Sequence, residues 1–319
     1  MVTNIAFPSY QRIWCVVLNW KNWDATEMCI QSVSQSSTIA CIVIVDNESD
    51  SEKVRTSPTN VATTRMAGTP CVVIASKANR GFAAGVNLGI EYAIQKGATA
   101  ILLLNNDVVV GPASIQKMAD AMAKDETIGA VGAWIRFPSQ NGEMGAVQCR
   151  GGGFVSSRAG NVVQSRQAGD KLDYLTGACM LIRKELAVAT KGFDERYFMY
   201  WEDVAFGFKT RELGYRIVVA DDAYAEHVLS SSRDKAGNLL EAYESWSAME
   251  FASRDGVVLR LTVAVRQLLS CCMHMLAGRP SVASAKFNGI RFWTRHRAVL
   301  QAYTVVDELQ ARMGKLPIQ

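Results

Sequence analysis

The feature that most constrains this chain is a short apolar run that ends abruptly on polar residues. Residues 101–104 have the sequence Ile-Leu-Leu-Leu and are followed directly by Asn105, Asn106 and Asp107. An all-apolar run of this length predicts a central strand of a parallel sheet, buried on both faces. Open α/β sheets bind ligands at the carboxyl ends of such strands, so we expect Asp107 to point into a ligand crevice. The alternative is an Asx turn that caps the following helix.

Strand-like runs alternate with segments of helical period along the first third of the chain. This alternation predicts right-handed βαβ units, and hence an α/β fold with a mainly parallel sheet flanked by helices. From residue 127 the alternation breaks, and the glycines of residues 150–171 indicate hairpins and loops, before a further strand over 174–183. The four early runs are 13–18, 40–45, 71–75 and 100–104.

Two helix signals accompany these strands. Asp24 and Glu27 have the spacing of a capping box, which predicts Asp24 as the N-cap of the first helix. Gly81, Gly85 and Gly89 recur at four-residue intervals and form a bare face on which another part of the backbone can pack closely. The spacing is not the G-x-G-x-x-G fingerprint of dinucleotide binding, and no G-x-x-x-x-G-K-[ST] phosphate loop occurs.

Composition indicates a globular chain with a large core. The 319 residues are 49% hydrophobic and 20% charged, enough for one large domain or one and a half. The eight cysteines show no C-x-x-C spacing, which indicates buried, reduced thiols in a cytoplasmic protein. Residues 1–10 contain no basic residue and residues 13–18 are too short for a signal segment, so we expect no secretion.

The C-terminal region differs in charge and pattern. Residues 256–319 carry nine Lys or Arg residues against Asp307 and Glu308, a formal balance of +7. The pattern predicts two helices, 257–278 and 281–303, divided by Gly278-Arg279-Pro280. The uncharged stretch 267–278 is too short to span a bilayer, so any membrane contact is expected to be peripheral.

These two helices have the composition of a membrane-surface element. The first repeats Arg260, Gln267 and His274 every seventh residue, and the second mixes aromatic with basic residues. Such helices suit an in-plane seat on an anionic membrane, and the alternative is packing on a catalytic domain with a solvated basic face. No RNA or DNA motif accompanies the charge, so we expect no nucleic acid partner. The residues of the second helix are Phe287, Phe292 and Trp293 with Lys286, Arg291, Arg295 and Arg297.

Three carboxylates occupy positions where a ligand is expected. Asp46 follows the apolar residues 43–45, Asp107 follows the central run, and Asp203 opens a helix after the aromatic residues of 197–201. Asp46 and Asp107 lie at the same edge of a parallel sheet, so one ligand can touch both. Asp46 can accept a hydrogen bond from a base N–H, and Asp107 can hold a divalent cation on a diphosphate. Sugar transfer from such a ligand then needs a general base.

Six motifs in order resemble one family over about residues 13–230. The chain resembles the inverting family 2 glycosyltransferases with the Rossmann-like GT-A fold, and within them the rhamnosyltransferase-like branch. The resemblance implies a GT-A catalytic domain over residues 1–235 and a basic, amphipathic helical extension over 236–319. The matching segments are 16–22, 45–50, 79–89, 103–108, 176–183 and 192–203.

The resemblance implies roles in donor binding. Trp20 stacks on the nucleobase, Asp46 accepts its hydrogen bond, and Arg80 contacts base or ribose. Residues 105–107 take the place of the D-x-D metal motif, but the first Asp is replaced by Asn, so Asp107 alone supplies charge. We expect an exchangeable Mg²⁺ or Mn²⁺ site that forms fully only with the donor bound. The implied substrate-binding residues are Leu18, Asn19, Trp20, Asp46, Arg80, Gly81, Asn87, Asn105, Asn106, Gly177, Ala178, Trp201 and Glu202.

The same resemblance implies Asp203 as the catalytic base. Glu202 is the competing candidate, although at a helix start it also suits a capping or orienting role. His227 contacts diphosphate or metal, or is a core histidine. Trp201 is a platform for an acceptor sugar or part of the core. Gly177 and its neighbour Ala178 lie near the reacting sugars, or form the tight start of a strand.

Together these features predict an enzyme that transfers one sugar with inversion at the inner face of the cell membrane. The donor is a nucleoside-diphosphate sugar, dTDP-rhamnose first and a UDP-sugar next, and the acceptor is a hydroxyl of a lipid-linked, O-antigen or exopolysaccharide type glycan. A sugar-nucleotide nucleotidyltransferase is one alternative, but residues 18–23 lack the glycine that its phosphate loop needs. A catalytically silent, membrane-associated binding protein is the other, which Asn105 keeps open.

Overall fold

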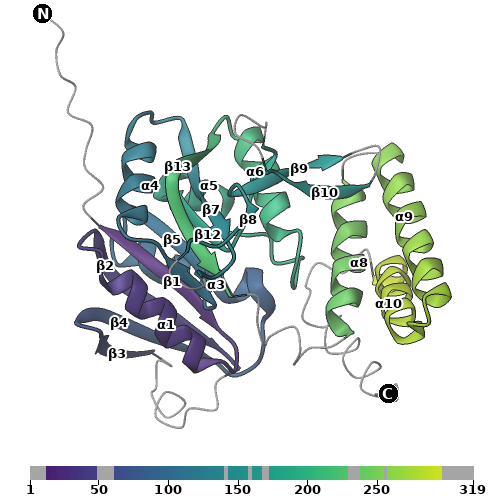
Figure 1. Ribbon diagram of the computed structural model, residues 1–319, viewed down its shortest axis with the longest axis horizontal. Coiled ribbons are helices and arrows are strands. Elements are labelled where there is room, and N and C mark those ends of the chain that lie inside the picture. Colours follow the sequence, from purple (N-terminus) through teal and green to yellow (C-terminus); the bar gives the residue numbers. More distant parts are fainter. Residues whose placement is uncertain are drawn as a thin grey trace, which may run out of the picture.

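A mixed, mostly parallel β-sheet forms the centre of the structure, and helices cover both of its faces (Figure 1). The computed structural model does not describe residues 1–10, where no signal segment was expected, or residues 297–303, where the last predicted helix was expected to end. The described residues are 12–48, 61–139, 143–156, 160–166, 172–228, 238–254 and 257–296.

Four parallel strands form the first half of the sheet and confirm the four apolar runs. They lie in the order β4, β2, β1, β5, so that β1 is held between β2 and β5. Nearly all side chains of β1, β2 and β5 are buried, because the strands are apolar on both faces. The strands are β1 (Ile13–Asn19), β2 (Ile39–Asn47), β4 (Thr69–Ser76) and β5 (Ala100–Asn105).

The second half of the sheet was predicted from the sequence only in part, because the strand expected over 174–183 contains β12. Next to β5, the strand β12 runs antiparallel and pairs on its other side with β7, which is parallel to β13. The expectation of hairpins and loops from residue 127 is therefore wrong for β7. The remaining strands are β3 (Val61–Met66), β6 (Val108–Val110), β7 (Ile128–Arg136), β8 (Val147–Cys149), β12 (Cys179–Arg183) and β13 (Arg216–His227).

Small residues explain why β7 was missed. Its sequence, IGAVGAWIR, is rich in glycine and alanine, because neighbouring backbone packs closely on it. A Cβ added at Gly132 would lie 3.0 Å from Leu175 Cδ2 and 3.1 Å from the Gly151 carbonyl oxygen. Close packing of neighbouring backbone thus explains the small residues of β7, which give it a weaker strand signal than large apolar side chains would.

A second, three-stranded sheet projects from the main one. Its order is β10, β9, β11, and the β9–β10 pair confirms the hairpin expected in residues 150–171. The strand expected over 174–183 is confirmed at both of its ends, but it is not continuous, because the chain leaves one sheet and enters the other at Thr176, Gly177 and Ala178. The strands are β9 (Gly152–Ser156), β10 (Asn161–Gln164) and β11 (Tyr174–Leu175).

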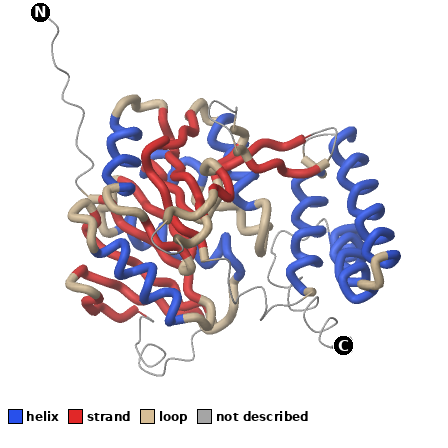
Figure 2. Tube along the Cα trace, in the orientation of Figure 1, coloured by secondary structure: helices blue, strands red, loops and turns tan. Residues whose placement is uncertain are grey.

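Two sets of helices sandwich the main sheet (Figure 2). One hydrophobic cluster joins α1 and α4 to one face, and a second joins α3, α5 and α6 to the other. The alternation of side chains along β1 supplies both clusters. The helices are α1 (Trp23–Ser34), α3 (Gly81–Gln95), α4 (Ser114–Ala123), α5 (Lys184–Thr190) and α6 (Glu202–Glu212).

The start of α1 corrects the capping-box prediction. The N-cap residue is Asn22, and Asp24 lies inside the first turn. The side chain that serves this helix start comes from the sheet, because Asn19 Oδ1 accepts hydrogen bonds from Asn22 N at 3.3 Å and Thr26 Oγ1 at 2.9 Å. The helix start is thereby fastened to the end of β1.

The glycine face of α3 confirms the close-packing prediction. A Cβ at Gly85 would lie 2.6 Å from Leu18 Cδ1, and one at Gly89 would lie 2.6 Å from Val16 Cγ1. These contacts set α3 directly on β1. The helix start is therefore held close to the carboxyl end of the sheet.

Three further helices form a bundle beside the sheet, to which the β9–β10 hairpin reaches (Figure 1). Of these, α9 and α10 confirm the two predicted helices, and α8 precedes them. The boundary expected between residues 235 and 236 lies outside the described residues. None of the helices in the described part of the chain is long and apolar enough to cross a membrane. The helices are α8 (Leu239–Ala252), α9 (Val257–Leu276) and α10 (Pro280–His296).

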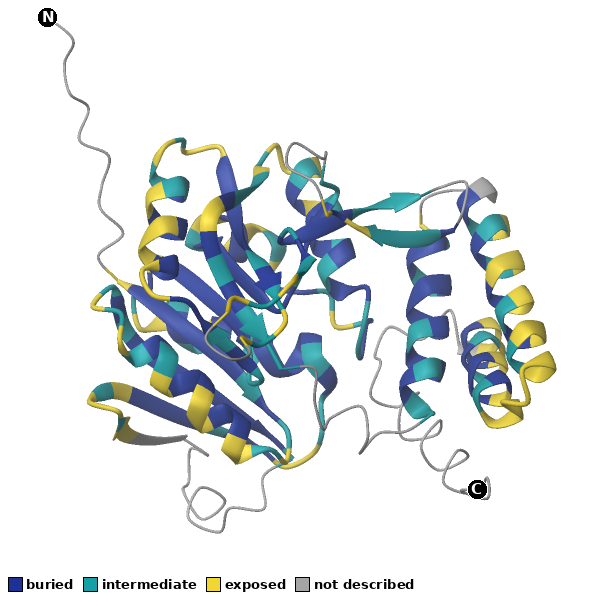
Figure 3. Cartoon of the chain, viewed as in Figure 1, coloured by how far each residue is buried: buried dark blue, intermediate teal, exposed yellow. Residues whose placement is uncertain are grey.

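The bundle shares a hydrophobic cluster with residues 197–204 of the catalytic region. Two of the aromatic residues expected at a membrane, Phe292 and Trp293, are buried in this cluster. The expectation of a membrane role is wrong for these two, since they belong to the cluster that α10 shares with α8, a helix that is mostly buried (Figure 3). The cluster joins the helical extension firmly to the segment that carries Asp203.

Replacing Gly89 by Ala tests the glycine face. Helix propensity alone would raise the free energy of unfolding by about 1 kcal/mol, whereas overpacking against Val16 should lower it by about 1–3 kcal/mol. We expect a net loss, measured by urea denaturation. A variant more stable than the parent would contradict the close approach of α3 to β1.

Candidate active site

The carboxyl ends of three adjacent strands bring predicted site residues side by side. Asn19 at the end of β1 pairs in register with Asp46 at the end of β2, and Leu18 pairs with Asn105 at the end of β5. The structure thus brings these side chains to one edge of the sheet, as expected. This edge is where open α/β sheets bind ligands.

Asp46 is held in place by its neighbour on β1. Asn19 Nδ2 donates a hydrogen bond to Asp46 Oδ1 at 2.9 Å, and both residues are buried. Since Asn19 Oδ1 accepts from Thr26 Oγ1, the Asn19 side chain is engaged at both ends. Asn19 therefore acts on the edge as a positioning residue for Asp46.

Trp20 lies just beyond the end of β1. Its indole Nε1 donates to Glu48 Oε2 at 2.9 Å, and Lys21 Nζ lies 3.2 Å from the same oxygen. Lys21 Nζ also lies 5.9 Å from the centre of the Trp20 ring. The half-buried Trp20 is thus fixed at the rim of the edge by a polar partner at Glu48.

The start of α3 is tied to the end of β2 by a residue that the sequence did not single out. Asn47 Oδ1 accepts from the Arg80 backbone N–H at 2.8 Å, and Asn47 Nδ2 donates to the Gly81 carbonyl at 3.1 Å. Gly81 has a φ of +76°, and an added Cβ would lie within van der Waals radii of the Phe198 carbonyl and ring. Only glycine fits there. The Arg80 backbone is thereby held by Asn47, the residue that follows Asp46.

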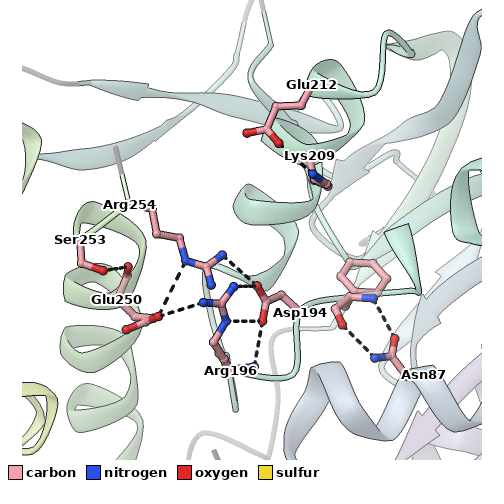
Figure 4. Close-up of polar contacts among 9 residues, drawn as sticks. Asn87, Asp194, Arg196, Lys209, Glu212, Glu250, Ser253 and Arg254 are labelled. Atoms are coloured by element: carbon pink, nitrogen blue, oxygen red, sulfur yellow. Dashed lines mark hydrogen bonds and ion pairs between the residues drawn. The ribbon is translucent and has the colours of Figure 1, made fainter. Parts of the chain in front are cut away.

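Asn87 lies farther along α3 and has a different set of partners. Its side chain donates to the Phe193 carbonyl at 2.8 Å and accepts from Phe193 N at 2.8 Å (Figure 4). It also donates to Glu195 Oε1 at 3.1 Å. These bonds fasten the segment that leads to Asp203 onto α3. The observed role of Asn87 is therefore positioning.

The residues after β5 connect three elements. Asn106 Nδ2 donates to Thr26 Oγ1 at 3.1 Å and to the Asn22 carbonyl at 3.3 Å, which ties this turn to α1. Asp107 Oδ1 lies 3.1 Å from His227 Nε2, because the end of β13 pairs with β6. Asp107 and His227, which are 120 positions apart in the sequence, thus meet as the metal hypothesis requires.

The Asp107–His227 pair fits part of a divalent cation site. Adjacent ligands of a six-coordinate Mg²⁺ or Mn²⁺ lie about 3 Å apart, as these two atoms do. Their side chains are 14% and 18% exposed, so water and a ligand can reach them. The described residues contain no group of three or more His, Cys, Asp or Glu side chains suited to a metal. The pair suits a cation whose other ligands come from a diphosphate and water.

Asp203 sits at the second position of α6, facing the chain between the two sheets. Its Oδ2 accepts from Gly177 N at 3.2 Å, and its Oδ1 accepts from Val204 N at 2.8 Å. Desolvation raises the pKa of Asp203 to about 6, and the two backbone N–H groups limit the rise. Asp203 is therefore ionised at neutral pH with a proton affinity suited to a general base.

Gly177 and Ala178 join this carboxylate to the sheet edge. The Ala178 carbonyl accepts from Asn105 N at 3.1 Å, directly across from β5. A Cβ at Gly177 would lie 3.4 Å from the Phe82 ring and 3.9 Å from Asp203 Cβ. Asp203 is thus next to the edge that carries Asn105.

Glu202 has a different environment from Asp203. It is 7% exposed, and its Oε2 atom has no hydrogen-bond partner among the described residues. Burial and then the charge of Asp203 raise the pKa of Glu202 well above its usual value. Glu202 is therefore the protonated member of the pair, which favours Asp203 as the base.

A pocket of about 220 Å³ opens beside Asp203. The hairpin forms one wall, the segment 200–204 another, and Glu244 of α8 lines it from the helical bundle. Glu244 is held by Lys286 Nζ at 3.0 Å. The sequence did not reveal Glu244 or the hairpin residues, because no local pattern indicates that α8 packs here. The other lining residues are Cys149, Gly152, Val162, Gln164, Tyr174 and Thr176.

Trp201 both lines this pocket and packs in the core. It has a φ of +67°, is 6% exposed, and lies 5.2 Å from Phe251 of α8, ring centre to ring centre. The left-handed backbone turns the chain sharply into α6. Both alternatives for Trp201, platform and core, are compatible with this placement.

An ion network holds the preceding loop against α8 (Figure 4). Asp194 Oδ2 lies 2.7 Å from Arg196 Nη2 and 2.9 Å from Arg254 Nη1. Both arginines also approach Glu250 Oε1 at 3.8 Å. The network links the segment before Asp203 to the helical bundle.

Comparison with known proteins agrees with this geometry. Residues 14–189, more than half of the chain, match the family model described as glycosyl transferase family 2. The chain is 29% identical over 231 residues to N-acetylglucosaminyl-diphospho-decaprenol L-rhamnosyltransferase of Mycobacterium tuberculosis. This match covers 60% of this chain and 75% of that protein. The chain is also 28% identical over 152 residues to the O-antigen biosynthesis protein RfbC of Myxococcus xanthus. That match covers 44% of this chain and 12% of that protein.

Two solved structures share the fold. GalNAc-T7 with UDP, GalNAc and Mn²⁺ has a TM-score of 0.58 at 14% identity, over 76% of this chain and 48% of that chain. The mannosyltransferase PcManGT from Pyrobaculum calidifontis, in complex with GDP-Man and Mn²⁺, has a TM-score of 0.50 at 13% identity, over 95% of this chain and 87% of that chain. At such identities the likeness concerns the fold alone, and it confirms the GT-A expectation.

Proposed function

The chain belongs to glycosyl transferase family 2 and is a glycosyltransferase, and we propose that it transfers one sugar with inversion to a lipid-linked glycan precursor. The observation that carries the proposal is the position of Asp203. Its carboxylate has a raised pKa, lines a pocket, and is one hydrogen bond from the turn that joins the sheet edge. A base in that position can serve an acceptor on one side and a donor on the other.

Asp203 takes the acceptor's proton in a single displacement. The acceptor hydroxyl oxygen forms a bond to C1 of the donor sugar, while the bond from C1 to the diphosphate oxygen breaks. The hydroxyl proton moves to the Asp203 carboxylate, and the electron pair of the broken bond leaves on the diphosphate. No covalent intermediate is needed, so the configuration at C1 inverts.

The donor's nucleotide lies along the carboxyl edge of β2, β1 and β5. Asp46 accepts a hydrogen bond from the base, Trp20 stacks on it, and Arg80 contacts base or ribose. Asn19 supports this by holding Asp46 at 2.9 Å. The rhamnosyltransferase relative favours dTDP-rhamnose as the donor, with a UDP-sugar as the next choice.

Asp107 and His227 would hold Mg²⁺ or Mn²⁺ on the diphosphate. When bound, the cation neutralises the diphosphate charge and makes it a better leaving group. The Asn105 and Asn106 side chains lie in the same turn and bring no charge, which makes the site dependent on diphosphate oxygens. The Mn²⁺ in both structural neighbours is consistent with this assignment.

The pocket beside Asp203 receives the acceptor. Gly177, Ala178 and Trp201 border the reacting groups, and Glu244 offers a carboxylate to a sugar hydroxyl. The names of the two relatives, a decaprenol-linked rhamnosyltransferase and an O-antigen biosynthesis protein, favour a lipid-linked surface glycan.

Replacing Asp203 by Asn tests the base. Loss of proton transfer should lower kcat by about 10²–10⁴-fold, while the dissociation constant of the nucleotide stays within about twofold. Turnover is measured by nucleoside diphosphate release and affinity by calorimetry. Glu202→Gln is the matched control, because a protonated Glu202 and a glutamine are similar in charge and shape. If the two variants exchanged these effects, Glu202 would be the base.

The pH profile tests the same assignment without a mutation. Asp203 acts only when ionised, so kcat/KM should fall about tenfold per pH unit below its pKa of about 6. Glu202→Gln should keep this acid limb, since the neutral Glu202 does not titrate there. An acid limb close to the ordinary carboxyl pKa of about 4 would contradict the proposal.

Thermal unfolding tests the donor site and its metal. With UDP, GDP, dTDP and CDP, we expect one pyrimidine diphosphate to raise the Tm by a few °C, more with Mn²⁺, because a ligand of the folded state stabilises it. Mn²⁺ alone should have little effect. His227→Ala should remove the Mn²⁺ increment, and His274→Ala on α9 is the control. A full shift with Mn²⁺ alone would contradict dependence on the diphosphate, and no shift with any nucleotide would favour a silent binding protein.

A further inference from the structure

Helix α9 exposes an apolar stripe to solvent along its whole length. Its members recur every three or four residues and therefore lie on one side of the helix. Figure 3 shows these exposed positions along the side of α9 that faces away from α8. The exposed fractions are Leu261 60%, Val265 54%, Leu268 47%, Leu269 58%, Met273 63% and Leu276 89%. We call these six residues the α9 stripe.

The α9 stripe is not the pattern that the sequence drew attention to. The heptad positions face the bundle, where Gln267 is buried and accepts from Ser245 Oγ at 3.0 Å. Trp293 of α10 is also turned inward and donates to Glu250 Oε2 at 3.1 Å. Gln267 and Trp293 thus pack within the bundle, whereas the six aliphatic residues of the α9 stripe are exposed.

The surroundings of the α9 stripe are strongly basic. Residues 257–296 contain six Lys or Arg residues and no Asp or Glu. Lys286 is buried with Glu241 and Glu244 of α8, which balances its charge. Phe287 of α10 adds a 51% exposed ring. The four exposed basic residues are Arg266, Arg279, Arg291 and Arg295.

We propose that the α9 stripe is a docking face for an anionic lipid bilayer, with α9 lying in the plane of the membrane surface. An exposed apolar face of this extent needs a cover, and its basic border selects a negatively charged one. A second copy of this chain fits less well, since α9 and α10 carry exposed arginines and no Asp or Glu, so a symmetric pairing of two α9 stripes would bring like charges together. Lipid headgroups supply the opposite charge instead.

The fold couples this face to the pocket. Gly160, at the turn of the β9–β10 hairpin, packs so tightly on α9 that an added Cβ would lie 2.9 Å from Thr262 C and Val263 N. The same hairpin and α8 line the pocket beside Asp203. Docking through α9 therefore fixes the pocket wall relative to the lipid surface. This consequence for a lipid-linked acceptor rests on the proposed function, but the docking does not.

A native thiol allows the contact to be measured. All eight cysteines lie in described residues, and Cys272, between Leu269 and Met273 on α9, is the exposed one. The full-length protein, labelled there with an environment-sensitive fluorophore, should show a blue shift with vesicles of phosphatidylcholine and phosphatidylglycerol. The protein should also sediment with these vesicles, and at least about tenfold less with pure phosphatidylcholine or at high salt.

Two sets of variants locate the face. Val265→Ser, Leu269→Ser and Met273→Ser together should lower vesicle binding at least about tenfold, with the Tm retained. Met28→Ser, Val188→Ser and Leu213→Ser are the matched control, since these residues are 50%, 53% and 38% exposed on the catalytic region. Equal binding by both sets would overturn the proposal, as would a full-length protein that does not sediment. A dimer in sedimentation velocity that the stripe variant abolishes would assign the face to a second copy instead. The vesicle-binding experiments contain no sugar donor, so their outcome does not depend on whether the proposed transferase activity is found.

Discussion

The structure depends on one turn, in which the chain passes from the small sheet to the large one at Thr176–Ala178. On one side, the Ala178 carbonyl accepts from Asn105 N at 3.1 Å and continues the antiparallel pairing of β12 with β5. On the other, the Gly177 N–H donates to the Asp203 carboxylate at 3.2 Å. A Cβ at Gly177 would lie 3.4 Å from the Phe82 ring, in van der Waals contact. The distance between the strand edge and the carboxylate is therefore set by backbone, which is more rigid than any contact between side chains.

The helical bundle takes part in the site and is not a mere appendage. It shares a hydrophobic cluster with residues 197–204. Ion pairs among Asp194, Arg196, Glu250 and Arg254 also join the segment before Asp203 to the bundle. Partly buried ion pairs of this kind add geometric definition more than stability. Since Glu244 also lines the pocket, a change in how α8 sits would move one pocket wall and the loop before Asp203 together.

Much of the fold could be predicted where burial is written into the local pattern. The runs that became β1, β2 and β5 are apolar on both faces, and the α3 glycines recur at the helical period, so a single segment carries enough information. β7 could not be predicted because its small residues are required by close packing against Leu175 and Gly151, which are distant in sequence. The outward face of α9 was hidden for the same reason, since only the position of α8 decides which side of an amphipathic helix is covered. The proposed metal and base residues were predicted from the motifs. The structure adds that Asp107 lies beside His227 and that Asp203 lies beside Gly177.

The charge balance of the pocket explains why two adjacent carboxyls can have different roles. Glu202 and Asp203 cannot both ionise cheaply in a desolvated site, so a proton must remain on one of them. Two backbone N–H groups point at the Asp203 carboxylate, whereas Glu202 Oε2 has no hydrogen-bond partner among the described residues, so the negative charge resides on Asp203. Lys286 lies against Glu244, so that this third carboxylate adds little field. The pocket therefore carries one effective negative charge, on the carboxylate that the proposed mechanism uses as the base.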